Sequence, residues 1–233
     1  MRSRRTLAAA ALAVAALCAP APALAAPPAS ARVAVLLKAH PVRSYPGLDA
    51  QPTETISARR PLTRTPTSLP ILQSATSADG RRWLWARLPG RPNGRTGWIL
   101  ARDVAIDVVR WQVRVDLSAR RLTAYRSGHR VRSFRVVVGK AATPTPRGAF
   151  FVEEIVRLGK GAELGPYAMA LSARSTVLQE FAGGPGQIAL HGRGRIGGTP
   201  GRAQSHGCVR LRDADITWLA QHVLAGTPVT ITA

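Results

Sequence analysis

The sequence predicts a mainly β chain with a single helix near its carboxyl end. After residue 32, short stretches of alternating polar and apolar residues are separated by Gly and Pro, as is typical of strands joined by turns. A helical pattern appears once and late, with Asp213 as its expected N-cap and Gly226 as its expected stop. One face of this helix carries Ile216, Leu219, Ala220, Val223 and Leu224. No internal repeat is apparent, which argues against a repeat architecture.

The second half of the chain shows the clearest strand patterns. The expected strands are residues 113–116, 121–126, 131–139, 149–155 and 227–232. The first three follow one another closely and are separated by turn residues such as Ser127-Gly128, which predicts an antiparallel meander. Residues 143–148, with the sequence TPTPRG, interrupt the pattern because proline cannot join the middle of a ladder.

Residues 33–107 predict a separate and smaller β module. Alternation over residues 82–88 predicts a half-buried strand, and residues 97–100, with the sequence GWIL, predict another. The pair resembles the last strands of a bacterial SH3-like module, which implies a small barrel. Burial in the core or at the barrel edge is the expected role of Trp83, Trp85 and Trp98.

Residues 1–25 have the three parts of a secretory signal peptide: early arginines, an apolar run and the small-residue pattern ALA at 23–25. The apolar run, residues 6–17, is shorter than the roughly 20 residues needed to span a bilayer. We therefore expect a cleaved signal and no stable transmembrane anchor. The adjacent Arg4 and Arg5 leave twin-arginine export open beside the general secretory route. A Pro/Ala-rich linker, residues 26–32, follows.

The chain is strongly basic, with 33 Lys and Arg against 12 Asp and Glu, and a formal net charge of +21. Such a charge predicts attraction to polyanions, and for a secreted protein these are anionic wall polymers. The basic residues are scattered, and no aromatic-basic stripe suited to nucleic acid is present. We expect no nucleic-acid partner, and a monomer in the periplasm or cell wall.

Cys208 is the residue with the clearest chemical meaning. The other cysteine, Cys18, lies inside the predicted signal peptide, so the exported chain keeps one thiol. Exported proteins normally pair their cysteines, and an unpaired thiol is therefore either reactive or a buried leftover. His206 and Arg210, two residues before and two after Cys208, favour a nucleophile held as thiolate.

A second histidine, His191, precedes Cys208 by a glycine-rich stretch that can fold back as a loop. An imidazole beside the thiol would take its proton and later protonate a leaving amine. We expect the thiolate–imidazolium ion pair to form at a pH well below the pKa of a free thiol, which is roughly 8.5. The backbone N–H groups of Gly207 and Cys208 are the expected donors to a developing oxyanion.

These motifs resemble those of a known family. The sequences IALHG at 188–192 and SHGCVRL at 205–211 resemble the catalytic motif of the L,D-transpeptidases of the YkuD type. The segments TPTPRGAF at 143–150 and GPYAM at 165–169 resemble further family segments. The resemblance covers about residues 110–233 and implies a β-sandwich catalytic domain, which we place at residues 108–233.

The resemblance implies acyl transfer on peptidoglycan stem peptides, with a cysteine thioester intermediate and 3→3 cross-links as product. Cys208 would be the nucleophile, His191 the general base, and the Gly192 carbonyl the group that orients the imidazole. Support of the oxyanion region is expected of His206 and Gly207, and substrate binding of Arg210, Ser205 and Tyr167. No metal and no organic cofactor is implied.

Three alternatives stay open on the sequence alone. Water rather than an amine could resolve the acyl-enzyme, which would make the protein an L,D-carboxypeptidase. A catalytically retired wall-binding protein would bind polyanions without Cys208. A zinc site could use His191, His206 and Cys208, whose ligand types suit this metal. The family often has Thr after the His-Gly pair, whereas this chain has Arg193, and this difference leaves the acceptor open.

Overall fold

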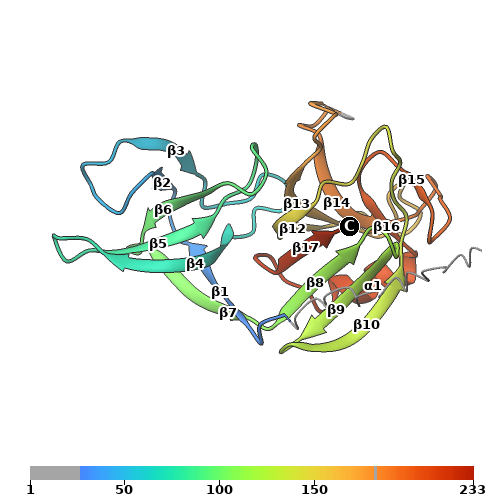
Figure 1. Ribbon diagram of the computed structural model, residues 1–233, viewed down its shortest axis with the longest axis horizontal. Helices are drawn as coiled ribbons and strands as arrows, with labels where there is room; N and C mark the ends of the chain where they lie inside the picture. The colour runs from blue at the N-terminus through green and yellow to red at the C-terminus, as the bar shows by residue number, and fades with distance from the viewer. Residues whose placement is uncertain (1–26, 181–182) are drawn as a thin grey trace, which may run out of the picture.

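The computed structural model describes residues 27–180 and 183–233, which form two lobes that each contain one large sheet (Figure 1). The predicted signal peptide lies outside the described residues. Strands dominate both lobes, and the described residues contain one α-helix. The prediction of a mainly β chain with one late helix is therefore confirmed. Within the described part of the chain, no helix is long and apolar enough to cross a membrane.

The first lobe is a seven-stranded sheet in the order β3-β2-β6-β5-β4-β1-β7. Its strands are β1 Ala31–Leu36, β2 His40–Arg43, β3 Pro52–Ile56, β4 Ser68–Thr76, β5 Arg82–Arg87, β6 Thr96–Leu100 and β7 Val104–Val109. The predicted strands at 82–88 and 97–100 are present as β5 and β6, which pair antiparallel. The sheet begins inside the predicted linker, because Ala31 and Arg32 already pair with β7.

The second lobe is built on an eight-stranded sheet in the order β10-β9-β8-β17-β12-β13-β14-β16. Its strands are β8 Trp111–Asp116, β9 Arg121–Arg126, β10 His129–Arg135, β12 Gly148–Arg157, β13 Tyr167–Arg174, β14 Gln187–Gly192, β16 Val209–Leu211 and β17 Pro228–Thr232. The predicted meander is confirmed as β8-β9-β10. Two short strands, β11 Val138–Gly139 and β15 Ala203–Ser205, pair separately. The predicted strand 131–139 is thus broken, because Val137 leaves β10 to bond Arg210 in both directions at 2.9 Å.

The helix α1, Asp213–Ala220, is shorter than the sequence pattern predicts. Its N-cap is Arg212, whereas the Asp213 carboxylate accepts a hydrogen bond from the Gly194 N–H at 3.0 Å. The helix ends at Ala220, and Leu224 beyond it is 61% exposed rather than on the buried face. Ile216 and Leu219 do lie in the core, where α1 packs against β13 and β14.

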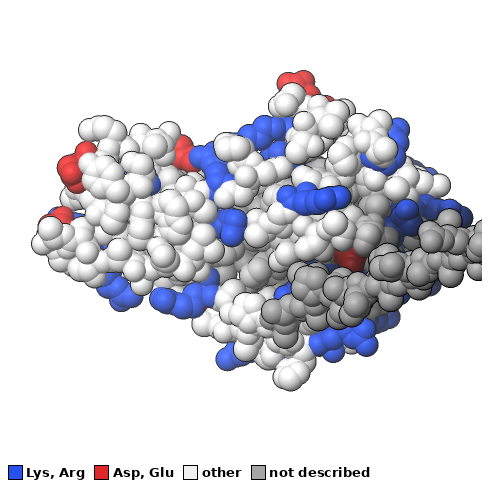
Figure 2. All heavy atoms as spheres, viewed as in Figure 1, with Lys and Arg blue, Asp and Glu red and all other residues white. Residues whose placement is uncertain are grey.

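Basic side chains are distributed over both lobes on the face shown in Figure 2, and acidic ones are sparse there. This agrees with the scattered arginines of the sequence. Several arginines are instead used inside the protein, where Arg60 and Arg174 form ion pairs with the buried carboxylate of Glu153. On this face the basic side chains are therefore spread out, with no single basic stripe.

Candidate active site

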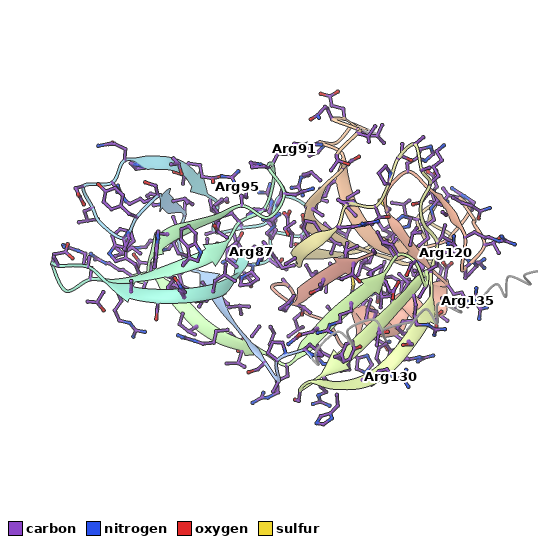
Figure 3. The ribbon with its side chains drawn as sticks, in the orientation of Figure 1. Arg87, Arg91, Arg95, Arg120, Arg130 and Arg135 are labelled. Atoms are coloured by element: carbon purple, nitrogen blue, oxygen red, sulfur yellow. The ribbon has the colours of Figure 1, made fainter. Side chains whose placement is uncertain are left out.

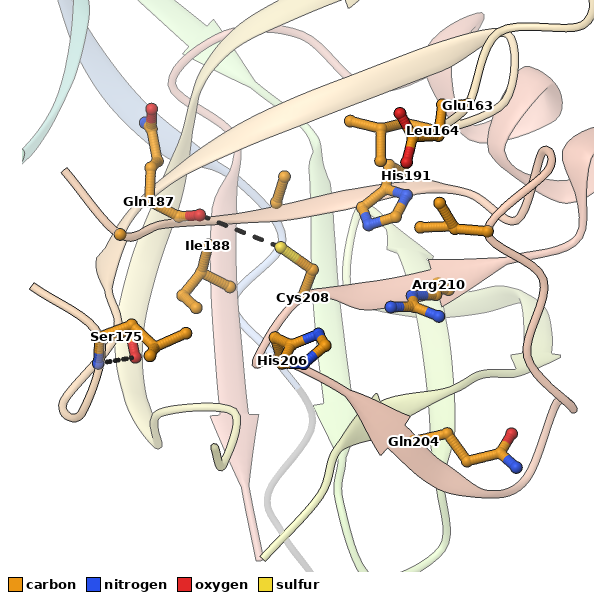
Figure 4. Close-up of a pocket in the computed structure, with 14 residues that line it drawn as sticks. Glu163, Leu164, Ser175, Gln187, Ile188, His191, Gln204, His206, Cys208 and Arg210 are labelled. Atoms are coloured by element: carbon orange, nitrogen blue, oxygen red, sulfur yellow. Dashed lines mark hydrogen bonds between the residues drawn. The ribbon is translucent and has the colours of Figure 1, made fainter. Parts of the chain in front are cut away.

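The register of β14 and β16 brings the predicted nucleophile and base to one face of the sheet. These strands are parallel, with Leu190 opposite Val209 and His191 opposite Arg210. Alternate residues of a strand point to opposite faces, and Leu190 and Val209 are fully buried in the core. The other face therefore carries His191 and Arg210, together with Cys208 immediately before β16. Figure 4 shows these three side chains around one pocket.

The imidazole of His191 is fixed by its own neighbour. Its Nδ1 lies 2.6 Å from the Gly192 carbonyl oxygen, which can only accept a hydrogen bond, so Nδ1 carries the proton and Nε2 is left as the basic nitrogen. The residue is 2% exposed. The pKa of His191 is lowered to about 4, mainly by burial and in smaller part by the nearby Arg210 charge, against the opposing effect of the Gly192 carbonyl. At neutral pH this imidazole is uncharged and able to accept a proton.

The thiol of Cys208 is half-buried at the edge of the pocket and unpaired. Its Sγ lies 3.9 Å from the Gln187 carbonyl oxygen, to which it donates a weak hydrogen bond. Burial raises the pKa of Cys208, although the charge of Arg210 acts in the opposite direction. Both pKa shifts therefore oppose the predicted thiolate–imidazolium ion pair, because burial disfavours the charged form of each group. The resting pair is a neutral thiol and a neutral imidazole.

The turn that presents Cys208 is organised by a buried hydroxyl. The side chain of Ser205 is fully buried, donates to the Cys208 carbonyl at 2.6 Å and accepts from the Gly207 N–H at 3.2 Å. We expected Ser205 to bind substrate, but the structure places it beneath the nucleophile. The Gly207 N–H, expected to face an oxyanion, is occupied by that hydroxyl. Gly207 itself has φ +119° and approaches the side chain of Ile188, which suits a residue without a Cβ.

Two threonines that the sequence analysis did not single out hold the same turn. Thr145 donates its hydroxyl hydrogen to the Gly207 carbonyl at 2.8 Å, and Thr143 donates to the Ser205 carbonyl at 3.2 Å. Both are buried. Their signal in the sequence is the TPTPRG segment, where the prolines stiffen the backbone that carries the two threonines. The segment that interrupts the sheet is thus the support of the catalytic turn.

The pocket around Cys208 is a cavity of about 710 Å³. His191, His206 and Arg210 line it with the thiol, so the structure brings together these four predicted site residues. Tyr167 does not line this cavity but a neighbouring one of about 390 Å³. That second cavity is also lined by Arg157, Lys160 and Asp213.

The sequence departure at position 193 has a local explanation. The Arg193 guanidinium donates to the Gly198 carbonyl at 2.9 Å and so ties together the loop that follows the His-Gly pair. Arg210, across the cavity, reaches the Gly197 carbonyl of the same loop at 3.5 Å. Across residues 27–180 and 183–233, no three His, Cys, Asp or Glu side chains are grouped as metal ligands, and the three side chains of the zinc alternative are not so arranged.

The chain is similar to several proteins described as L,D-transpeptidases. A YkuD protein of Bacillus licheniformis is 29% identical over 163 residues, which are 67% of this chain and 90% of that protein. A solved L,D-transpeptidase from Mycobacterium smegmatis is 18% identical, with a TM-score of 0.41, over 72% of this chain and 91% of that one. A solved mutant of the Enterococcus faecium L,D-transpeptidase is 21% identical, with a TM-score of 0.38, over 53% of this chain, which spans half (50%) of that protein.

Residues 110–231 match the family described as YkuD, L,D-transpeptidase catalytic domain. The match covers just over half of the chain and includes both Cys208 and His191. The chain therefore belongs to the YkuD family of L,D-transpeptidase catalytic domains.

Proposed function

We propose that this protein is a secreted peptidoglycan L,D-transpeptidase that forms 3→3 cross-links through a thioester on Cys208. The observation that carries the proposal is the pairing of Cys208 with a neutral, tautomer-defined His191 on one face of the sheet. Family membership supports an acyltransferase of this class. The donor would be a tetrapeptide stem, and no cofactor takes part.

In the acylation step, the sulfur of Cys208 attacks the carbonyl carbon of the third residue of the donor stem. His191 Nε2 accepts the thiol proton as the carbon–sulfur bond forms, because the resting thiol is not ionised. The imidazolium then gives this proton to the leaving amine of D-Ala as the peptide bond breaks. The Cys208 backbone N–H is the proposed donor to the oxyanion, since the Gly207 N–H is engaged.

In the second step, the side-chain amine of a neighbouring stem attacks the thioester. His191 takes a proton from that amine, and the released sulfur of Cys208 regains a proton from the imidazolium. Arg210, which lines the cavity, is positioned to bind a carboxylate of the stem peptide. His206 lines the same cavity and would shape the region around the tetrahedral intermediate.

The test is an incubation of residues 26–233 with purified disaccharide-tetrapeptide, followed by mass spectrometry, with Cys208→Ala as the control. A dimer that has lost one D-Ala, formed by the parent and absent from the control, is the expected product. Formation of tripeptide monomer without any dimer would overturn the transpeptidase proposal and show L,D-carboxypeptidase activity instead. No product from folded, reduced parent would overturn the enzymatic proposal and favour the wall-binding alternative.

A further inference from the structure

We infer that Arg91 and Asn93 of the first lobe are positioning residues for the substrate cavity of the second lobe. Both lie in the loop between β5 and β6, at the boundary between the lobes, where Figure 3 labels Arg91. They bond the backbone of residues 174, 175, 178 and 185, of which Ser175 and Leu178 line the Cys208 cavity and the other two lie next to lining residues in the chain. The inference rests on the proposed function, because the cavity is taken to hold the donor stem.

Arg91 binds three backbone carbonyl groups of this wall at once. Its Nη1 donates to the Pro185 carbonyl at 2.8 Å, and its Nη2 donates to the carbonyls of Ser175 and Leu178 at 3.0 and 2.9 Å. The guanidinium presents several donors in a fixed plane, so the three carbonyls are held in one geometry. Two stretches of the wall, around residues 175–178 and at residue 185, are thereby joined.

Asn93 binds the start of the same wall as a neighbouring strand would. Its side-chain amide donates to the Arg174 carbonyl at 2.8 Å, and its side-chain oxygen accepts from the Arg174 N–H at 2.7 Å. Both backbone groups of Arg174 are therefore satisfied by one side chain from the other lobe. Because Arg174 is the last residue of β13, this pair of bonds defines the direction in which the chain leaves the sheet.

The backbone held in this way leads directly to the substrate and the nucleophile. Ser175, Leu178, Gly186 and Gln187 all line the Cys208 cavity. The Ser175 N–H donates to the Gly186 carbonyl at 2.7 Å, and this bond holds residues 175 and 186 together. The next residue, Gln187, supplies the carbonyl oxygen that faces the Cys208 thiol, as Figure 4 shows. A shift of this wall would therefore change the shape of the cavity beside the reacting sulfur.

Gly186 packs closely against the Leu178 carbonyl and the Arg91 guanidinium. It has φ +61°, and a Cβ at this position would collide with the Leu178 carbonyl oxygen and lie 3.1 Å from Nη2 of Arg91. A side chain here would push apart the carbonyl groups that Arg91 joins. The absence of a Cβ at Gly186 and the reach of Arg91 thus serve the same arrangement.

The test compares Arg91→Ala with Arg81→Ala, a control that removes the same charge from an exposed ion pair with Asp79, within the first lobe. In the Arg91→Ala protein we expect a KM for the tetrapeptide donor raised by about tenfold and a kcat changed by less than about twofold, because Cys208 and His191 are held by other elements. Arg91→Lys keeps the charge but not the planar fork, so most of the loss should remain. Arg81→Ala should match the parent.

Hydrogen exchange of the same full-length variants gives a readout that does not require activity. Amides of residues 174–178 should exchange faster in Arg91→Ala than in the parent, while those of β16 should not change. An inactive parent would refute the proposed function and leave the exchange result to decide the inference. An active parent with unchanged KM and unchanged exchange in Arg91→Ala would overturn the inference, as would an equal effect of Arg81→Ala.

Discussion

At the scale of single residues, burial decides the protonation of the catalytic pair. His191 is buried and Cys208 is half-buried at the edge of the cavity, and partial removal from water disfavours the imidazolium and the thiolate alike. The pKa of His191 falls to about 4 and that of Cys208 rises. Under the proposed function, proton transfer within this uncharged pair would accompany attack on the substrate rather than precede it.

This charge state has a direct test in the alkylation of Cys208 by iodoacetamide. We expect the rate to stay low from about pH 5 to pH 8 and to rise only above about pH 8.5, because the raised pKa keeps the thiol protonated at neutral pH. The urea-unfolded protein is the control and should react faster than the folded one at pH 7. A rate plateau below about pH 7 in the folded protein would instead reveal the ion pair.

At the scale of elements, the catalytic turn depends on side chains beneath it. The hydroxyl of Ser205 accepts a hydrogen bond from the Gly207 N–H and donates one to the Cys208 carbonyl, and the hydroxyl of Thr145 donates to the Gly207 carbonyl. Each of these bonds is made by a buried group, for which a missing partner costs about 1–3 kcal/mol. The turn is therefore held rigidly, and the direction of the thiol is determined by groups that never touch substrate.

We expect Ser205→Ala to lower the rate of acylation by about tenfold, because a turn without its bridging hydroxyl no longer presents the thiol in one orientation. The measurement is the rate of adduct formation with a carbapenem, followed by mass spectrometry of the intact protein. Ser118→Ala is the matched control, since that hydroxyl bonds Asp116 in an exposed turn away from the site. Equal rates in the two variants would show that Ser205 does not position Cys208.

At the scale of the whole molecule, β12 is shared by the two lobes. Phe150 and Val152 lie in the core of the second lobe, whereas Phe151 lies in the core of the first. Glu153 follows at a register irregularity of the same strand, and its carboxylate is fully buried against Arg60 and Arg174. One strand with alternating side chains thus contributes to both cores. We infer that the lobes unfold together.

The contribution of the buried Glu153 carboxylate to the stability of the protein can be measured. Glu153→Ala should lower the free energy of unfolding by about 3–5 kcal/mol, because two arginine charges would stay buried without their partner. Asp79→Ala, which breaks an exposed pair with Arg81, should lower the free energy of unfolding far less, because water screens that pair. Urea unfolding of the two variants and the parent gives both values. If both variants lost a similarly small free energy of unfolding, the arginine charges around Glu153 would have to be hydrated.

Local patterns predicted much of this protein. The alternation of residues 121–126 and 82–88 predicted strands that the structure contains, and the motifs around Cys208 and His191 resemble those of the family to which the chain belongs. These features extend over a few residues and follow from strand geometry and from the chemistry of a thiol beside an imidazole. The late helix was predicted in kind but extended too far, because Leu224 matches the periodicity yet lies beyond the turn at Gln221.

The sequence by itself determined the strand pattern, the basic charge and the motifs around Cys208 and His191 that resemble those of the family. Only the tertiary structure decided that the pair is uncharged, that Ser205 lies under the turn, and that Arg91 reaches Leu178, 87 residues away in the chain. The physical reason is that burial and hydrogen bonding depend on which distant segments meet. Periodicity reports the face on which a side chain lies, but not the partner it will find there.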